Sequence, residues 1–249
     1  MRQFKEILIA IIVVGAVSFL LYSLLQSDAK RRNRELAKRI AELSPKGGPP
    51  ETIDGLRKAI ALYEDQIERN VKEGAQTGTY WKILAIRLAD KGMHNDALKA
   101  FERAIYFISE DPVVYYLTGV SAGIAAKSVV GFSASADKER DQLFKLSENS
   151  YKRALELDAA YTKPMYGLAV LYVFELNRPA EAIPLLDRYL SVNTSDFQAM
   201  FILARANAVT GNYKQAVEIY EKIISKSKKK EIQAEASNNI ETVQRMMYE

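Results

Sequence analysis

The stretch that decides the fold is FQAMFILARANAVTGNYKQAVEIY, at residues 197–220. The small residue Ala204 precedes a glycine turn at Gly211, and Ala216 is followed four residues later by Tyr220. Apolar residues three and four positions apart share one face of a helix, and glycine suits a turn between two helices. The stretch therefore predicts two antiparallel helices joined by a short turn.

The same pattern recurs along the chain at a regular distance. Pairs of residues 16 positions apart mark the first and second helices of three segments: Trp81 and Ala97, Tyr166 and Ala182, and Met200 and Ala216. Two of these segments, 163–196 and 197–230, are contiguous and 34 residues long. Such a period indicates stacked repeats, because each helix pair can bury its apolar face only against its neighbours.

This pattern resembles the tetratricopeptide repeat family, in particular membrane-anchored members of bacterial type. The resemblance rests on a large residue followed by a small one, a turn with glycine, and Ala-x3-aromatic on the second helix. It implies an all-α solenoid of about four helix-turn-helix repeats, expected at 78–112, 112–161, 163–196 and 197–230. A covering helix at 52–73 and a capping helix at 231–248 are expected at its ends.

The second expected repeat is longer than the others. Gly119 and Ala154 are 35 residues apart, whereas the equivalent Ala85 and Ala104 are 19 apart, so 16 residues are inserted near 125–140. That length predicts a projecting helical hairpin. Its apolar tip comprises Val129, Val130 and Phe132. Two hypotheses stay open for this tip: contact with a partner, or a flexible loop packed on its own repeat.

The first helices of such repeats line an inner groove, and their phase predicts which side chains face it. The predicted partner-binding residues on this surface are Lys82, Ile83, Ile86, Tyr116, Leu117, Leu168, Phe201, Ile202 and Arg205. Because most are apolar, the groove suits an amphipathic helix or an extended apolar segment of a protein partner. The clamp that some family members use for acidic chaperone tails is matched only by Lys82. A competing hypothesis fills the groove with one of the protein's own terminal helices.

An apolar segment precedes the repeats. From Ile7 to Leu25 the chain has 19 residues without a charge, a length of about 28 Å as a helix. Because the apolar region of a signal peptide is usually shorter, the run predicts a single-pass transmembrane helix. The expected organisation is a tail and anchor at 1–26, a basic helix and Pro/Gly linker at 27–50, and the solenoid at 51–249.

The positive charge lies beside this apolar segment. The chain carries a net charge of +4, and 27–50 holds seven Lys or Arg and three acidic residues. Residues 1–26 carry +1, which leaves −1 for residues 51–249 and argues against nucleic-acid binding by the body. We expect an inner-membrane protein. The charge distribution favours a cytoplasmic location for residues 51–249. The short tail before the apolar segment favours a periplasmic location instead. We favour the periplasmic side and leave the cytoplasmic side open.

Few residues are available for chemistry. The chain has no cysteine and one histidine, His94, which excludes disulfides, thiolate metal sites and metal sites built on several imidazoles. The sequence has no glycine-rich phosphate loop, metal-ligand spacing or nucleophile motif. We therefore expect no enzyme, cofactor or metal, and interpret His94 as a turn residue and Trp81 as a core residue.

The leading hypothesis is a membrane-anchored scaffold or adaptor that mediates protein–protein interactions in the assembly or quality control of a cell-envelope complex. One alternative is a structural accessory subunit of an envelope machine, such as a periplasmic flagellar motor or a secretion system. Another is a protein that resembles an organelle import receptor, although the chaperone-tail clamp of such receptors is missing here.

Overall fold

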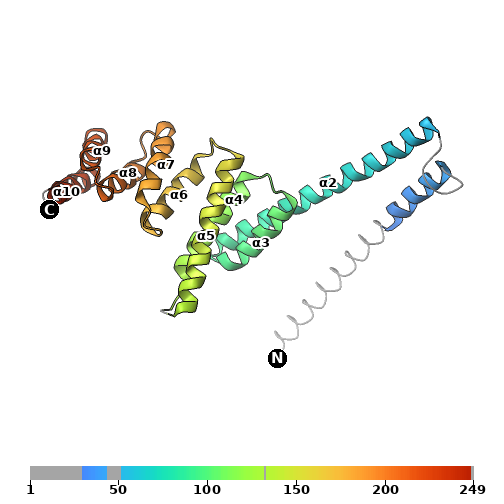
Figure 1. Ribbon diagram of the computed structural model, residues 1–249, viewed down its shortest axis with the longest axis horizontal. Helices are drawn as coiled ribbons and strands as arrows, with labels where there is room; N and C mark the ends of the chain where they lie inside the picture. The colour runs from blue at the N-terminus through green and yellow to red at the C-terminus, as the bar shows by residue number, and fades with distance from the viewer. Residues whose placement is uncertain (1–29, 44–51, 132, 248–249) are drawn as a thin grey trace, which may run out of the picture. The chain divides into compact units, whose positions relative to one another are not determined.

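The computed structural model describes residues 30–43, 52–131 and 133–247, and within these ranges every regular element is a helix. The chain divides into two compact units, one up to Glu73 and the other from Gly74 to Glu249. The first unit contains a helix over 30–43 and the N-terminal part of α2 (Ile53–Asp90). The solenoid occupies the second unit (Figure 1).

The predicted transmembrane helix from Ile7 to Leu25 lies outside the described residues. Within 30–43, 52–131 and 133–247, no helix combines the length and the apolar character needed to cross a membrane. The two helices of highest mean hydropathy there, α4 (Pro112–Ser128) and α6 (Thr162–Phe174), have 17 and 13 residues, fewer than the roughly 20 that a span requires. The predicted fold with an N-terminal membrane anchor and the predicted inner-membrane location are corrected accordingly: the described residues form an all-helical solenoid and contain no membrane-spanning helix.

Helix α2 is a single helix of 38 residues. The sequence had suggested a separate covering helix at 52–73 and a first repeat helix that begins near 78. Gly74 and Gly78 lie between these two segments, and each weakens a helix by only about 1 kcal/mol. Because no proline interrupts the stretch, the helix continues through both glycines.

The second unit continues with helices that pack pairwise in chain order. After α2 come α3 (His94–Phe107), α4, α5 (Ala134–Leu157), α6, α7 (Pro179–Val192), α8 (Phe197–Val209), α9 (Tyr213–Lys226) and α10 (Lys230–Met246). From α3 onward each helix contacts the next, and α4, α6 and α8 also contact one another in order. These three helices therefore form one side of the solenoid.

Left-handed residues make the turns between paired helices. Gly92 and Gly211 have φ angles of 75° and 81° and join α2 to α3 and α8 to α9. Asn177, at φ 51°, does the same between α6 and α7. Glycine adopts this conformation without steric cost, and asparagine is among the few other residues that tolerate it.

Small residues allow the helices to approach closely. Ala85, Ala97, Ala104 and Ala216 are fully buried, so their backbones lie against neighbouring helices. Trp81, interpreted from the sequence as a core residue, is half-buried and packs against the first core cluster, which surrounds Phe101. Two further clusters continue along the solenoid, one with Leu186 and one with Tyr220.

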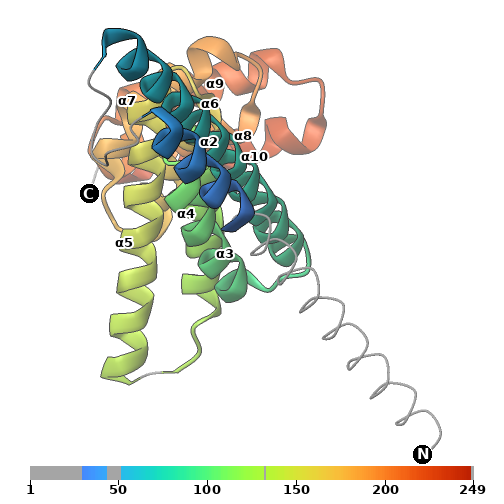
Figure 2. The ribbon, with the colours of Figure 1, turned by 90° about the vertical axis from the view of Figure 1, so that its right-hand side faces the viewer.

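The pair α4–α5 is longer than its neighbours. Helix α5 has 24 residues, compared with 14 in each of α3, α7 and α9. Figures 1 and 2 show its N-terminal end extending past the adjacent helices of the second unit. Ser133 caps this end by accepting a hydrogen bond from the backbone N–H of Ala136 (3.3 Å). At the tip Val130 is 93% exposed and Val129 half-buried, and Phe132 lies outside the described residues.

Candidate partner-binding surface

A groove opens between α4 and α6, with α5 beneath it. It encloses about 160 Å³ and is named here the α4–α6 groove. Its lining residues are Val120, Gly123, Ile124 and Lys127 of α4, Phe144, Ser147 and Tyr151 of α5, and Gly167, Val170, Leu171 and Glu175 of α6. Because α4 and α6 belong to consecutive helix pairs, the groove exists only when the repeats are stacked.

Tyr151 forms the floor of the groove. Its side chain is 6% exposed and fits between two glycines. A β-carbon at Gly119 would lie 2.7 Å from Cδ1 of the ring, and one at Gly167 would lie 2.8 Å from Cζ. Burial raises the pKa of the Tyr151 phenol further above the neutral range, in which a tyrosine is already uncharged. Both helices thus need glycine to leave room for this ring.

A second contact fixes α5 against α4. The hydroxyl of Ser147 donates a hydrogen bond to the carbonyl oxygen of Gly119 (2.7 Å). Ser147 is 1% exposed, and this bond satisfies its polar atom in the core. The backbone of α4 is thereby held at the distance from α5 at which Tyr151 fills the space below the groove.

The sides of the groove are apolar and its rim is charged. Ile124 is 42% exposed, while Val120 and Val170 are half-buried. At one end Lys127 and Glu175 form an ion pair across the two helices, with Nζ and Oε1 3.1 Å apart. An apolar floor and sides with charge at the rim suit an apolar side chain carried by a polypeptide, whose polar backbone can face the rim.

The apolar surface continues along α6 towards α8. Phe174 is 49% exposed, and the guanidinium of Arg205 on α8 lies 5.4 Å from the centre of its ring. An arginine over an aromatic ring is a favourable contact of about 0.5–1 kcal/mol at an exposed site. Arg205, one of the predicted site residues, therefore shields a ring that the sequence reasoning did not select.

The structure places several predicted site residues in packing positions. Lys82 is bound to Asp111, with Nζ and Oδ2 2.7 Å apart. Ile86 and Leu117 pack against the first core cluster, whereas Ile83 is 47% exposed on α2. Lys82 therefore already has a carboxylate partner within the chain.

Three more predicted residues are mainly core residues. Leu168 is 2% exposed and lines the opposite side of α6 from the groove. Ile202 is 8% exposed, and Phe201 packs its ring 5.8 Å from that of Tyr220. Tyr116 is half-buried, and its ring lies 6.2 Å from that of Tyr151, which places it beside the floor of the groove. Burial raises the pKa of Tyr116 as well.

The sequence reasoning missed residues that lie in the groove. Ile124, Val170 and Phe144 line it but were not among the predicted site residues. The available signal was the four-residue spacing from Tyr116 through Val120 to Ile124, which repeats one face of α4. That signal was hidden because apolar residues occur on all sides of α4 and α6.

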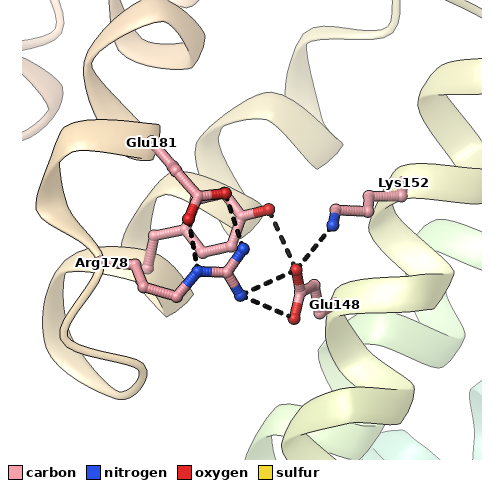
Figure 3. A network of polar contacts seen from close by, with 5 residues as sticks. Glu148, Lys152, Arg178 and Glu181 are labelled. Carbon is pink, nitrogen blue, oxygen red and sulfur yellow. Dashed lines mark hydrogen bonds and ion pairs between the residues drawn. The ribbon is translucent and has the colours of Figure 1, made fainter.

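A second, wider pocket lies on the other side of α6, between α5 and α7. It encloses about 530 Å³ and is lined by Lys152, Leu155, Glu156, Leu168, Tyr172, Glu181, Pro184 and Leu185. Three of its residues belong to, or directly contact, a polar network around Glu148, namely Lys152, Tyr172 and Glu181. Figure 3 shows this network from close by. This side of α6 therefore combines apolar and fixed charged groups.

The network joins the long helix α5 to the turn between α6 and α7. Arg178 donates to both carboxylate oxygens of Glu148, at 3.0 and 3.1 Å, while Lys152 binds the same carboxylate at 2.7 Å (Figure 3). Tyr172 donates its hydroxyl to Glu148 at 3.1 Å, and Arg178 also contacts Glu181. Burial acts to raise the pKa of Glu148, but the hydrogen bonds from Lys152 and Arg178 outweigh it, so this pKa is lowered. The network stabilises the charged carboxylate and holds two repeats together.

The described residues offer no group of three or more histidine, cysteine or acidic side chains arranged to hold a metal ion. His94 is the first residue of α3 and follows the turn at Gly92 and Met93. The candidate partner-binding surface therefore consists of apolar side chains and ion pairs.

Comparison with known proteins agrees with this architecture. Residues 168–231 match the family model described as tetratricopeptide repeat. Residues 168–231 therefore carry tetratricopeptide repeats. Proteins built from these repeats mediate protein–protein interactions, and the predicted repeat family is confirmed. The predicted membrane-anchored, bacterial type is not tested by this match. Among curated proteins, none matches the chain by sequence.

Several solved structures share the fold. YrrB, described as a TPR protein with an unusual peptide-binding site, is 18% identical over 73% of this chain and 83% of its own, with a TM-score of 0.58. MamA from Desulfovibrio magneticus RS-1 is 12% identical over 69% of this chain and 96% of its own, with a TM-score of 0.53. A thermophilic TPR protein of Thermus thermophilus is 16% identical over 72% of this chain and 88% of its own, with a TM-score of 0.50. At these identities the likeness concerns the fold alone.

Proposed function

We propose that this tetratricopeptide repeat protein is an adaptor that binds an apolar helical or extended segment of a protein partner in the α4–α6 groove. The observation that carries the proposal is the groove itself, with Tyr151 as an apolar floor and the ion pair between Lys127 and Glu175 at its rim. Apolar grooves with polar rims bind amphipathic segments through a few anchoring side chains.

The geometry favours one or two apolar side chains as the anchor. A volume of about 160 Å³ accommodates a group the size of a leucine or phenylalanine side chain, and Phe174 extends the apolar surface beyond it. The Lys127–Glu175 pair offers one donor group and one acceptor group to the partner's backbone or polar side chains. YrrB, a structural neighbour described with a peptide-binding site, supports peptide binding as a use of this fold.

The complex that such an adaptor serves remains a proposal from the sequence, namely the assembly or quality control of a cell-envelope complex. The long α4–α5 hairpin offers a second surface, because Val130 at its tip is almost fully exposed. We favour the groove, since a preformed concave site buries more of a partner than a single exposed valine does.

Site-specific photo-crosslinking in cells tests the proposal. A photoreactive phenylalanine analogue replaces Phe174, which borders the groove, and in a control variant it replaces Tyr106, an aromatic residue on α3 that is 74% exposed. The proposal predicts a discrete crosslinked protein with the probe at position 174, absent at 106. The captured protein should be lost when Ile124→Lys is added. Equal capture at both positions, or capture that survives Ile124→Lys, would contradict groove binding.

A further inference from the structure

The N-terminal part of α2 carries an apolar stripe that nothing in the described part of the chain covers. Its residues are Ile53, Leu56, Ile60, Tyr63, Ile67 and Val71, and this set is named here the α2 stripe. Their exposed fractions run from 40% at Leu56 to 73% at Ile53. Six exposed large apolar residues on one helix face form a patch typical of a protein–protein contact.

Five of the six residues of the stripe follow the spacing of a coiled coil over two heptads. Ile53, Ile60 and Ile67 recur every seven residues, with Leu56 and Tyr63 three residues after the first two. In this a/d pattern the apolar residues are alternately three and four positions apart. They form one narrow apolar seam that faces a partner helix. A seam of this kind differs from the broader face with which a helix packs into a globular core.

The helix over 30–43 covers a different face of α2. Leu36 of that helix and Leu62 and Gln66 of α2 line a shared pocket, and Ala59, on the same side of α2 as Leu62, is 7% exposed. These positions lie to one side of the α2 stripe on a helical wheel. The first unit therefore has one covered face and one uncovered seam.

The charged residues that flank the α2 stripe indicate what kind of helix packs against it. On the far side of α2, Lys58 pairs with Asp54 at 2.8 Å and Arg69 pairs with Asp65. Arg57 and Glu64 instead border the stripe, seven residues apart, and neither has an ion-pair partner within the described ranges. Opposite charges at equivalent flanking positions are the feature by which coiled-coil helices select partner and orientation.

We propose that the α2 stripe pairs with the α2 stripe of a second copy of this chain in an antiparallel coiled coil. In the register that packs Ile60 against Tyr63 of the partner subunit, Arg57 lies beside Glu64 of the partner subunit, and symmetry repeats the pair. A parallel arrangement would instead place Arg57 near Thr52 of the partner subunit and Glu64 near Ala59 of the partner subunit, with no opposite charges. The self-complementary charges therefore favour the antiparallel dimer.

Disulfide crosslinking of the full chain tests both the partner and the orientation. The chain has no native cysteine, so each introduced thiol reports one position. In the antiparallel register Leu56 faces Ile67 of the partner subunit, whereas two copies of either position lie about 16 Å apart along the axis. An oxidised mixture of Leu56→Cys and Ile67→Cys chains should form a covalent dimer, and each variant alone should not. Lys58→Cys, on the opposite face, is the matched control and should stay monomeric on a denaturing gel.

Charge reversal provides an independent readout by sedimentation of the full chain. Arg57→Glu and Glu64→Arg should each weaken dimerisation by about tenfold, because like charges then face each other, and the double variant should restore it. Both side chains are exposed, so circular dichroism should show an unchanged helix content.

Several outcomes would overturn the proposal. A crosslink by Leu56→Cys alone would show a parallel dimer, and failure of the double charge reversal to restore dimerisation would remove the Arg57–Glu64 pair. If the unmodified chain is monomeric, the rate at which a thiol reagent alkylates Ile60→Cys shows what else covers the α2 stripe. Slow alkylation would mean that another part of the same chain covers the stripe, and fast alkylation that the seam is free for a different protein. Either result would exclude the second copy.

Discussion

The ring of Tyr151 lies so close to the backbone at Gly167 that a β-carbon there would be 2.8 Å from its Cζ atom. Gly167→Ala should therefore force the ring or α6 to move and lower the free energy of unfolding by about 1–3 kcal/mol. Chemical denaturation followed by circular dichroism measures this change.

Gly123→Ala is the control for this prediction. It also changes a glycine that lines the α4–α6 groove, but its β-carbon would lie 3.4 Å from Oγ of Ser147, close to ordinary contact. Alanine is a better helix former than glycine by about 1 kcal/mol, so this variant should be as stable as the parent or slightly more so. Equal destabilisation by both substitutions would contradict the close fit of Tyr151.

The lowered pKa of Glu148 makes one part of the stability depend on pH. A carboxyl whose pKa is lower in the folded state than in the unfolded state stabilises the fold above its ordinary pKa, and this contribution disappears as pH falls through the lowered value. Glu148→Gln should lower the free energy of unfolding at neutral pH by about 1–2 kcal/mol, since it removes charge-assisted hydrogen bonds from Arg178 and Lys152. Denaturation curves at several pH values should show the difference shrinking in acid.

Glu181→Gln is the matched control for this prediction, because Glu181 also binds Arg178 but its side chain is 50% exposed. Exposed ion pairs contribute little, so its effect should stay below about 0.5 kcal/mol at neutral pH. A pH-independent effect of Glu148→Gln would mean that the side chain acts through packing and not through its charge.

Asp111 has two separate roles that substitutions can divide. It caps α4 by accepting a hydrogen bond from the backbone N–H of Val113 at 2.9 Å, and it binds Lys82 at 2.7 Å. Asp111→Asn keeps a capping side chain and loses the charge, whereas Asp111→Ala loses both. We expect Asp111→Ala to be less stable than Asp111→Asn by about 1 kcal/mol in thermal or chemical unfolding. Equal stability of the two variants would show that the cap contributes nothing.

The fully buried alanines at the helix crossings should not tolerate larger side chains. Ala97→Leu and Ala216→Leu should each cost about 1–3 kcal/mol of unfolding free energy, because the extra atoms have no space in the packed repeat. Ala234→Leu on the exposed face of α10 is the control and should change stability by less than about 0.5 kcal/mol. Tolerance of leucine at both buried positions would contradict the close packing of the repeats.

Much of the solenoid could be predicted because its signals are local and periodic. The 16-residue spacing from Met200 to Ala216 and the left-handed glycine at Gly211 follow directly from a helix, a turn and a second helix. The repeat at 163–196 was predicted, but its left-handed turn residue Asn177 was not identified, because asparagine replaces glycine there. The separation of α2 into two helices was wrong because glycine weakens a helix without ending it.

The groove was harder to predict than the repeats. In α6, Val170 and Leu171 line the groove while Leu168 lines the opposite pocket, and all three are apolar. Hydrophobic periodicity cannot assign a face to a helix that is apolar on all sides. The bond between Glu148 and Arg178 joins residues 30 positions apart, so no local motif could indicate it.

Binding of a protein partner in the α4–α6 groove is tested most directly by comparing the dissociation constants of two variants. Ile124→Lys places a charge in the groove, and Val130→Lys makes the same change at the tip of the α4–α5 hairpin. Both parent residues are exposed, so neither change should unfold the protein. For the partner captured by crosslinking at position 174, we predict that Ile124→Lys weakens binding at least about thirtyfold, corresponding to the loss of a central anchor contact worth about 2 kcal/mol, while Val130→Lys leaves it unchanged. Unchanged binding by Ile124→Lys together with a loss on Val130→Lys would contradict the account and assign the partner to the hairpin tip.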